Sequence, residues 1–320
     1  MSAHPIAVIG ASGQVARALQ RAGARRASNL VVAGRPVIDV ASQTSVKRVL
    51  DGITPGIVIN AAAYTDVDDA ERDEAAAFRI NRDGPHYLAK WCAATGVPLI
   101  HVSTDHVFDG SNPLPYRESD ACCPANAYGR SKAAGEDAIR DVLAHHVIVR
   151  TGWVYSADGR NFLKAMLHSA RERQVVDVIA DQHGAPTSAD DIAAALLDIS
   201  DVLLRGDGRR LHGTYHLAAD GETTWYGFAK QIYSVVAHEG RKAPRVEPIL
   251  TERSPAPANR PKYAVLDTTK MRNAFGLILP PWQHSVAACV RQMLAKESGF
   301  KANQPEEICE RRVASTTKVA

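Results

Sequence analysis

The sequence predicts an α/β protein with a doubly wound parallel sheet, followed by a smaller C-terminal α/β unit. Short runs of apolar residues recur along the first 150 positions, and segments with apolar residues at helical spacing separate them. Strands that are apolar throughout are typical of a parallel sheet covered by helices on both faces. After about residue 150 this alternation becomes irregular, which indicates a second unit.

Local patterns predict the individual elements. Strands are expected at residues 6–9, 30–33, 57–59, 97–102, 146–149 and 175–179. Helices are expected around residues 15–22, 46–50, 68–95, 161–173 and 189–204. Because proline lacks the amide hydrogen that a helix interior requires, we expect a break in the third helix at Gly84-Pro85. The prolines between residues 244 and 262 predict an extended loop there.

The same patterns suggest how the chain divides into domains. We expect the larger domain to span residues 1–152 and to take in about 185–212 as well. The smaller domain is expected at residues 153–184 and 213–299. Residues 300–320 are polar with few large apolar groups, a composition typical of a disordered tail.

Composition excludes several classes of protein. Of the 320 residues, 45% are hydrophobic and 23% charged, and the formal net charge is only +3, so neither nucleic acid nor a membrane surface is expected as the main partner. No apolar run reaches 18 residues, and no signal sequence is expected. The five cysteines are scattered without C-x-x-C spacing, which argues against a disulfide framework and a zinc site. A reducing cytoplasm fits them best.

A glycine pattern opens the first helix. Gly10-x-x-Gly13-x-x-Ala16 follows an apolar strand, which is the context that a dinucleotide-binding turn needs. The first glycine permits a tight turn, the second lets a phosphate approach the backbone, and a small third residue lets helix and strand pack closely. The helix N-terminus then offers unpaired N–H groups to a pyrophosphate. A turn with a purely structural purpose is the alternative, and the flanking elements disfavour it. The first domain is therefore predicted to be a Rossmann-type NAD(P)-binding domain.

The end of the second strand bears on the choice between NADH and NADPH. A carboxylate at this point binds the ribose hydroxyls of NAD, whereas an arginine accommodates the 2′-phosphate of NADP. The chain has Gly34-Arg35 here and no acidic residue before Asp39. This favours NADPH, with NADH also possible, and we expect Asp39 and Val40 to border the adenine.

Tyr128 and Lys132 are four residues apart, so on a helix they share one face. A lysine one turn from a tyrosine can lower the phenol's pKa from about 10 toward neutrality. Such a phenol can exchange a proton with an alcohol or carbonyl oxygen. An exposed polar pair without function is the alternative, and on this motif alone it would be favoured.

Three longer strings carry a family resemblance. They are Asn60-Ala-Ala-Ala-Tyr-Thr65, Ser103-Thr-Asp-His-Val-Phe108 and Pro124-Ala-Asn-Ala-Tyr-Gly-Arg-Ser-Lys132, and Asp181-Gln-His-Gly-Ala-Pro-Thr187 is a further match. The chain resembles the extended short-chain dehydrogenase/reductases and, more closely, the dTDP-4-dehydrorhamnose reductase family. The resemblance covers roughly residues 5–295. It implies NAD(P)H-dependent reduction of the 4-keto group of dTDP-4-dehydrorhamnose to dTDP-L-rhamnose.

The resemblance also implies roles for single residues. It implies a catalytic triad of Thr104, Tyr128 and Lys132. Positions matching the cofactor site are Gly10, Ser12, Gly13, Gln14, Val15, Ala62, Ala63, Thr65 and Val102, together with Tyr128, Lys132 and the residues named above after the second strand. Positions matching the substrate site are Thr104, Asp105, His106, Trp153 and Arg260, the last as a diphosphate contact. Some members of the family are dimers with Mg²⁺ at the interface, but no ligand set in this sequence fixes a metal.

Two alternatives stay open. One is another nucleotide-sugar reductase, epimerase or dehydratase of the same superfamily, because His106 stands where the family commonly carries tyrosine. The other is a non-catalytic regulatory subunit of this fold, which is disfavoured because Thr104, Tyr128 and Lys132 are all present.

Overall fold

The computed structural model describes residues 4–206, 210–254 and 256–302, and its centre is a six-stranded, all-parallel sheet. The strand order is β10–β5–β4–β3–β1–β2, which confirms the predicted fold class. The bounds of these strands are Ile6–Ile9 (β1), Leu30–Ala33 (β2), Ile57–Asn60 (β3), Leu99–Thr104 (β4), His146–Thr151 (β5) and Gly213–His216 (β10). The order reverses direction between β1 and β3, and ligands bind at such switch points, outside the carboxyl ends of the strands.

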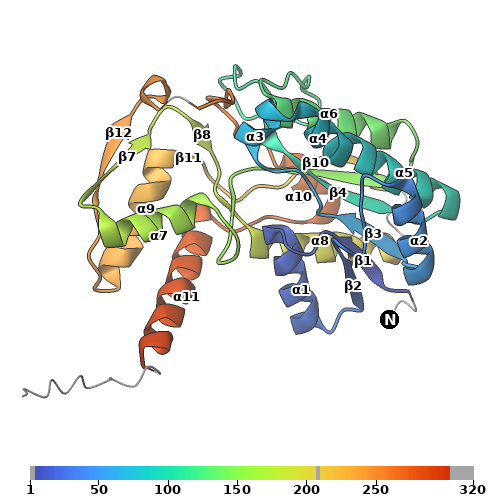
Figure 1. The fold of residues 1–320 in the computed structure, drawn as a ribbon, viewed down its shortest axis with the longest axis horizontal. Helices are drawn as coiled ribbons and strands as arrows, with labels where there is room; N and C mark the ends of the chain where they lie inside the picture. The colour runs from blue at the N-terminus through green and yellow to red at the C-terminus, as the bar shows by residue number, and fades with distance from the viewer. Residues whose placement is uncertain (1–3, 207–209, 255, 303–320) are drawn as a thin grey trace, which may run out of the picture.

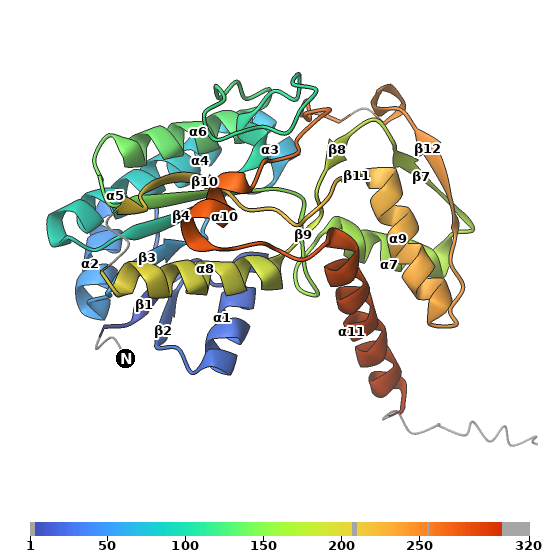
Figure 2. The same cartoon turned by 180° about the vertical axis from the view of Figure 1, so that it is seen from behind.

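Helices cover both faces of this sheet, as Figures 1 and 2 show. One face carries α1 (Gln14–Arg26), α8 (Ala189–Leu204) and α10 (Thr269–Phe275). The opposite face carries α2 (Gln43–Ile53), α5 (Gly84–Thr95) and α6 (Ala127–Arg140). Successive strand residues point to opposite faces, so each strand must be apolar throughout.

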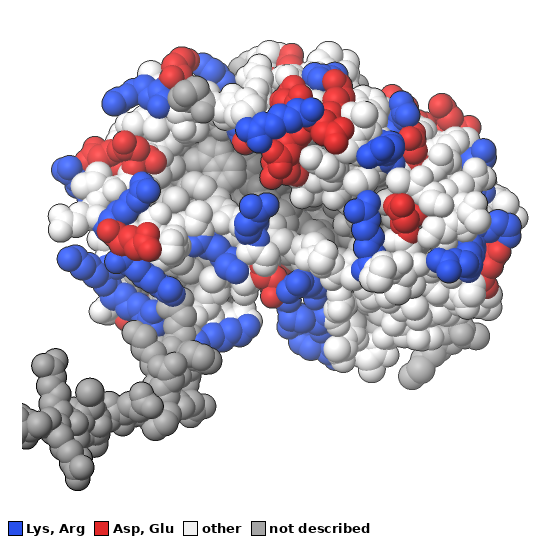
Figure 3. All heavy atoms as spheres, in the orientation of Figure 1, with Lys and Arg blue, Asp and Glu red and all other residues white. Residues whose placement is uncertain are grey.

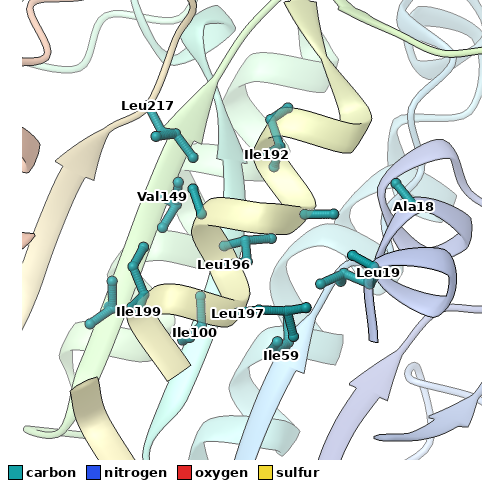
Figure 4. Close-up of a cluster of buried hydrophobic side chains, with 14 of the residues drawn as sticks. Ala18, Leu19, Ile59, Ile100, Val149, Ile192, Leu196, Leu197, Ile199 and Leu217 are labelled. Carbon is teal, nitrogen blue, oxygen red and sulfur yellow. The ribbon is translucent and has the colours of Figure 1, made fainter. Parts of the chain in front are cut away.

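The core beneath α8 shows how this packing works. Leu196 and Ile199 of α8 belong to the same buried cluster as Ile100 and Val149 of the sheet, with Leu19 of α1 beside them. Figure 4 shows these side chains directed toward one another between the helices and the strands. The helix predicted for residues 189–204 is confirmed, and α8 packs against the sheet.

A second hydrophobic cluster lies beside the sheet. It is formed by α7 (Phe162–Glu172), α9 (Trp225–His238), α11 (Trp282–Ala302) and the parallel pair β7 (Val175–Ile179) and β12 (Arg245–Ile249). Two further short pairs are formed by β6 (Val154–Tyr155) with β9 (Thr187–Ser188) and by β8 (His183–Gly184) with β11 (Thr223–Thr224). Figure 1 shows this part standing next to the carboxyl ends of the parallel strands.

The helical region 67–95 differs from the prediction. Its interruption falls at Asp73, between α3 (Val67–Arg72) and α4 (Glu74–Phe78), and not at Gly84-Pro85. A π-helix at Arg79–Asp83 leads directly into α5 instead, and the Gly84 amide donates to the carbonyl of Arg79, five residues back. The wider π turn makes room for the ring of Pro85, which then lies in the first turn of α5, where no amide hydrogen is needed.

The loop predicted for residues 244–262 is wrong for Arg245–Ile249, which form β12. Within the part of the chain that the structure describes, β12 pairs with β7 and with no second strand, so no neighbouring carbonyl lacks a partner because Pro248 has no amide hydrogen. The tail predicted for residues 300–320 is also wrong at its start, since α11 continues to Ala302; residues 303–320 lie outside the described residues.

The expected domain boundaries need one correction. Strand β10 pairs with β5 in the large sheet, although residues 213–216 were assigned to the smaller domain. Met271 of α10 and Leu279 likewise pack into the core of the sheet. The edge strand of a parallel sheet can come from a distant segment of the chain. Whether residues 213–216 belong to the large sheet therefore depends on tertiary pairing.

Charged side chains of both signs are interspersed on the face shown in Figure 3. Within residues 4–206, 210–254 and 256–302, no helix combines the length and the apolar character required to cross a bilayer.

Candidate active site

A cavity of about 760 Å³ lies at the carboxyl ends of β1, β3, β4 and β5. It brings together most of the residues that the sequence analysis proposed for cofactor and substrate. These are Ser12, Gly13, Gln14, Val15, Ala63, Thr65, Val102, Thr104, Asp105, His106, Tyr128, Lys132 and Trp153. They come from positions up to 141 residues apart, from the end of β1 to the turn after β5.

The glycine turn forms one wall of this cavity. Gly10 has a φ of +107°, and a Cβ there would lie 3.0 Å from the amide nitrogen of Ala62, so β1 and β3 can end this close together only with glycine. Gly13 is the N-cap of α1 and has no side chain that could bond to the amides of the first turn, which also lacks acidic residues. An uncapped helix N-terminus of this kind suits the pyrophosphate of a dinucleotide.

Helix α6 brings Tyr128 close to Thr104. Asn126 caps this helix by accepting a hydrogen bond from the Gly129 amide at 2.8 Å. A Cβ on Gly129 would lie 2.1 Å from the carbonyl oxygen of His106, so glycine lets the helix rest on the turn at Asp105–Val107 that follows β4. The phenol of Tyr128 thereby comes within hydrogen-bonding reach of Thr104.

The phenol of Tyr128 is less acidic than expected. Burial raises the pKa of Tyr128 to about 12, and the hydrogen bond with Thr104 offsets this only in part. The prediction of a phenol pKa near neutrality is therefore wrong for this structure. The phenol keeps its proton at neutral pH, which is the state that a proton donor requires.

Lys132 lies one turn further along α6 with only 1% of its surface exposed. Its Nζ donates to the carbonyl oxygen of Val102 at 2.7 Å and lies 3.1 Å from His101 Nε2. Burial lowers the pKa of Lys132 to about 8, although the carboxylate of Glu136 acts in the opposite direction. A lysine of this kind changes its charge close to physiological pH.

Two residues that line the cavity each have a buried oxygen without a hydrogen-bond partner among the described residues. These oxygens are Oδ2 of Asp105 and Oγ1 of Thr151. The other oxygen of Asp105 accepts from Thr104 Oγ1 at 3.0 Å, and burial raises the pKa of Asp105. Buried polar atoms without partners are costly, so these two oxygens are suited to bind hydroxyl groups of a ligand.

His106 lines the same cavity beside Tyr128. Its Nδ1 lies 3.0 Å from Asn126 Nδ2, and its ring meets that of Tyr128 edge-on with centroids 5.5 Å apart. Burial lowers the pKa of His106, so the ring is neutral. Because Asn126 Oδ1 is occupied by the helix cap, Nδ2 is the group that faces His106, which leaves the ring hydrogen on Nε2.

Trp153 has a left-handed backbone, with a φ of +49°. For a bulky residue this conformation is rare, and strain of this kind is concentrated at functional sites. Trp153 lines the cavity of about 760 Å³ described above. Trp225 is stacked on Trp153 and lines a neighbouring cavity of about 640 Å³. Phe162 borders both cavities.

Arg260 lines this neighbouring cavity. Its guanidinium binds both carboxylate oxygens of Asp68 in α3, at 2.8 and 3.2 Å. Its proposed contact with a diphosphate stays a prediction, and Asp68 is the group with which such a ligand would compete.

Several predicted cofactor residues lie outside the cavity. Gly10 and Ala62 lie against each other just after β1 and β3, and Val40 is packed in the core, against Gly84 of α5. Arg35 and Asp39 are exposed at the end of β2 and face each other at 3.8 Å. Their roles near the adenine and the 2′-phosphate stay predictions. No group of three or more His, Cys, Asp or Glu side chains in the described ranges is arranged to hold a metal ion.

The sequence analysis missed the segment that leads into α7. Arg160, Asn161 and Phe162 line the cavity, and Asn161 caps α7 while its Nδ2 donates to Gln14 Oε1 at 2.8 Å. An asparagine as the first residue of the predicted helix 161–173 was a detectable cap signal. That this helix end faces the glycine turn depends on tertiary packing.

Comparisons with known proteins agree with this site. A family model described as the RmlD substrate binding domain matches residues 4–295. A dTDP-4-dehydrorhamnose reductase from Sinorhizobium fredii is 42% identical over 289 residues, covering 90% of this chain and 97% of the relative. A probable dTDP-4,6-dihydroxy-2-methyloxan-3-one 4-ketoreductase from Streptomyces antibioticus is 35% identical over 292 residues, covering 91% and 96%.

A solved structure is similar over the same length. The dTDP-4-dehydrorhamnose reductase from Bacillus anthracis in complex with NADP has a TM-score of 0.82 and 33% identity, covering 90% of this chain and 99% of that chain. The resemblance carried by the three sequence strings is confirmed, and the chain belongs to the dTDP-4-dehydrorhamnose reductase family.

Proposed function

We propose that this protein uses NADPH to reduce the 4-keto group of dTDP-4-dehydrorhamnose and forms dTDP-L-rhamnose. The single observation that carries the proposal is the convergence of Thr104, Tyr128 and Lys132 on one cavity that the glycine turn of α1 also lines. The activity named for the relative from Sinorhizobium fredii supports the choice of substrate.

Thr104, Tyr128 and Lys132 have separate roles in this proposed reaction. A bound nicotinamide supplies the hydride that the carbonyl carbon accepts. The hydroxyl of Thr104, which donates to Asp105 in this structure, turns to the substrate's carbonyl oxygen, donates a hydrogen bond to it and orients it. As negative charge develops on that oxygen, Tyr128 donates its phenol proton and completes the alcohol. Lys132, as an ammonium, stabilises the phenolate that is left and holds the ribose of the cofactor.

The preference for NADPH rests on Arg35. Its guanidinium is exposed at the end of β2, where an arginine accommodates a 2′-phosphate. The Bacillus anthracis relative was solved with NADP, which supports the same preference. Asp39 lies beside Arg35, so use of NADH is a weaker second activity in this proposal.

A second candidate is the reduction of a different dTDP-4-keto sugar. The Streptomyces antibioticus relative carries a name of this kind. His106 favours this candidate in one respect, since it replaces a tyrosine that the family commonly carries beside the catalytic threonine. A non-catalytic role has no such observation in its favour. Homodimer formation and the use of Mg²⁺ stay predictions of the family resemblance.

The test is turnover by the purified protein. NADPH oxidation is followed by absorbance with dTDP-4-dehydrorhamnose as substrate, and the product sugar is identified by NMR. Tyr128→Phe should lower kcat by about 10²- to 10⁴-fold, the usual contribution of general acid catalysis. Tyr226→Phe is the matched control, since that ring lies on α9 against Lys230. Absence of NADPH oxidation with this substrate, or normal turnover by Tyr128→Phe, would overturn the proposal.

A further inference from the structure

A chain of buried polar groups extends from the end of β3 to Lys132. Asn60, His101 and Lys132 each have at most 1% of their surface exposed. Asn60 Nδ2 lies 3.0 Å from His101 Nδ1, and His101 Nε2 lies 3.1 Å from Lys132 Nζ. Inside a protein, such a network has to match every donor with an acceptor. Its donors and acceptors therefore determine which protonation states are compatible.

The orientation of the Asn60 amide is fixed by the backbone. Its Oδ1 accepts a hydrogen bond from the Ala62 amide at 3.1 Å. Turning the amide over would place its NH₂ group against the Ala62 N–H, which would oppose two donors. Nδ2 is therefore the group that faces His101, and it can only donate. His101 Nδ1 must accept this hydrogen bond.

This hydrogen bond selects one tautomer of His101. Burial, followed by the charge of Lys132, holds the pKa of His101 well below its ordinary value, so the ring is neutral. A neutral imidazole carries one ring hydrogen, and Nδ1 is the acceptor, so the hydrogen is on Nε2. The Nε2–H group then faces Lys132 Nζ and can only donate to it.

The donor on His101 affects the charge of Lys132. An ammonium has three donors and no acceptor, so it cannot accept a hydrogen bond from Nε2–H. A neutral amine has a lone pair for this bond and still donates to the carbonyl oxygen of Val102. The contact at 3.1 Å is thus favourable for the amine and unfavourable for the ammonium.

We propose that Asn60 and His101 are positioning residues that favour the neutral amine of Lys132 and thereby set the pH at which this lysine changes charge. This inference deepens the proposed function, because it assigns regulation of the same site. The pair touches neither substrate nor cofactor in this scheme. It acts only through Lys132, whose ammonium form stabilises the Tyr128 phenolate.

Other charged groups around Lys132 are consistent with this role. On its own helix, Tyr128 is a neutral phenol and Glu136 is a carboxylate that favours the ammonium. From β5, Arg150 binds this carboxylate at 2.6 Å and compensates its charge. From the turn after β4, Asp105 has a raised pKa. Burial and the imidazole of His101 on β4 therefore favour the neutral amine of Lys132. The carboxylate of Glu136 favours the ammonium, but Arg150 compensates its charge.

The first test reads the tautomer directly and requires no turnover. Protein labelled with ¹⁵N in its 12 histidine rings is examined by long-range ¹H–¹⁵N NMR. His101 is assigned by the signal that disappears in His101→Gln or, if that variant does not fold, by the ring signal that changes most in Asn60→Asp. We expect a neutral ring with hydrogen on Nε2 from pH 5 to 9. Hydrogen on Nδ1, or a charged ring, would overturn the proposal.

The second test uses a substitution that exchanges donor and acceptor in each hydrogen bond from residue 60 to Lys132. In Asn60→Asp, one carboxylate oxygen still accepts from Ala62, while the other accepts from His101 and moves the ring hydrogen to Nδ1. Nε2 then accepts from the ammonium of Lys132. The pH at which the Nε2 signal responds to Lys132 should rise by about one unit, a tenfold change in the acid constant. The alkaline limit of kcat should rise with it.

His216→Gln is the matched control for His101→Gln. His216 is equally buried in the same sheet, but it contacts Tyr116 and Arg150 instead of Lys132. It should leave the alkaline limit unchanged, whereas His101→Gln should raise it. A loss of kcat with an unmoved pH profile in both Asn60→Asp and His101→Gln would show a merely structural role. If the sugar assignment is wrong, turnover fails in every variant while the NMR signals still decide this inference.

Discussion

The indole ring of Trp153 lies parallel to that of Trp225, with planes 3° apart and centroids 3.6 Å apart. Gly184 lies against the same indole, and a Cβ there would be 2.4 Å from it. Phe162 extends the aromatic group, with its ring 4.7 Å from that of Trp225. Trp153 is thus fixed as a rigid wall of the cavity, although its own backbone conformation is unfavourable.

Removal of the stacked partner should loosen this wall. Trp225→Ala should raise KM for the sugar nucleotide by about 2- to 10-fold, since an aromatic pair contributes about 0.5–1.5 kcal/mol beyond its buried area. Steady-state kinetics with NADPH at saturation would measure it. Trp225→Phe keeps an aromatic ring and should retain most of the affinity. An unchanged KM in Trp225→Ala would show that Trp153 is held without the stack.

The hydroxyl of Thr104 should matter for the chemical step. Thr104→Val keeps the shape of the side chain and removes the donor to the carbonyl oxygen, so kcat should fall by about 10²- to 10³-fold. Single-turnover measurements of NADPH oxidation separate this effect from product release. Thr95→Val, which removes hydrogen bonds to the backbone carbonyls of Trp91 and Cys92 at the end of α5, is the control. Equal kcat in the two variants would contradict the assignment.

Arg35 should decide between the two coenzymes. Arg35→Ala should raise KM for NADPH about tenfold or more, because a hydrogen bond to a charged group is worth about 1.5–3 kcal/mol, and should leave KM for NADH nearly unchanged. Arg48→Ala is the control, since that side chain donates to the carbonyl of Val37 nearby. Parallel changes for both coenzymes would mean that Arg35 does not recognise the 2′-phosphate.

Glu136 should be the main ionic contribution to stability. Its carboxylate is fully buried and accepts from Arg150 Nη2, Arg140 Nη2 and Ser103 Oγ, each at 2.6 Å. Glu136→Gln leaves Arg150 without its counter-ion and should lower the free energy of unfolding by about 3–5 kcal/mol. Urea unfolding at pH 7 would measure it. Asp137→Asn, at an exposed position on the same helix, should change it by about 0.5 kcal/mol or less.

The same carboxylate predicts a pH dependence. Burial favours the protonated form, but the hydrogen bonds from Arg150 and Ser103 outweigh it and lower the pKa of Glu136. The stabilisation is therefore fully present above the unfolded pKa of about 4.3 and is lost as the pH falls toward the folded value. Glu136→Gln should lose less stability than the wild type between pH 5 and pH 3. Identical acid profiles would contradict this.

Prediction from sequence worked where a local pattern has one structural solution. An apolar run forms a strand, two spaced glycines form a turn, and apolar residues at helical spacing form a helix. Successive units of this kind form a parallel sheet. The prediction failed at Pro248 and Pro85, because the cost of a missing amide hydrogen depends on the neighbour that would have bonded to it. At Pro248 the strand has one partner among the described residues, and at Pro85 a π turn makes room for the ring.

Local sequence patterns were sufficient to predict the fold class, the glycine turn and the helix that places Tyr128 and Lys132 on one face. These features depend on residues a few positions apart, within the range of local backbone geometry. The stacking of Trp153 on Trp225, 72 positions away, and the contact of His101 with Lys132 depend on how distant segments pack in the folded chain. The acidity of a buried group depends on burial and on partners from distant strands. The pKa of Tyr128 and Lys132 therefore follows from the folded chain and not from their spacing.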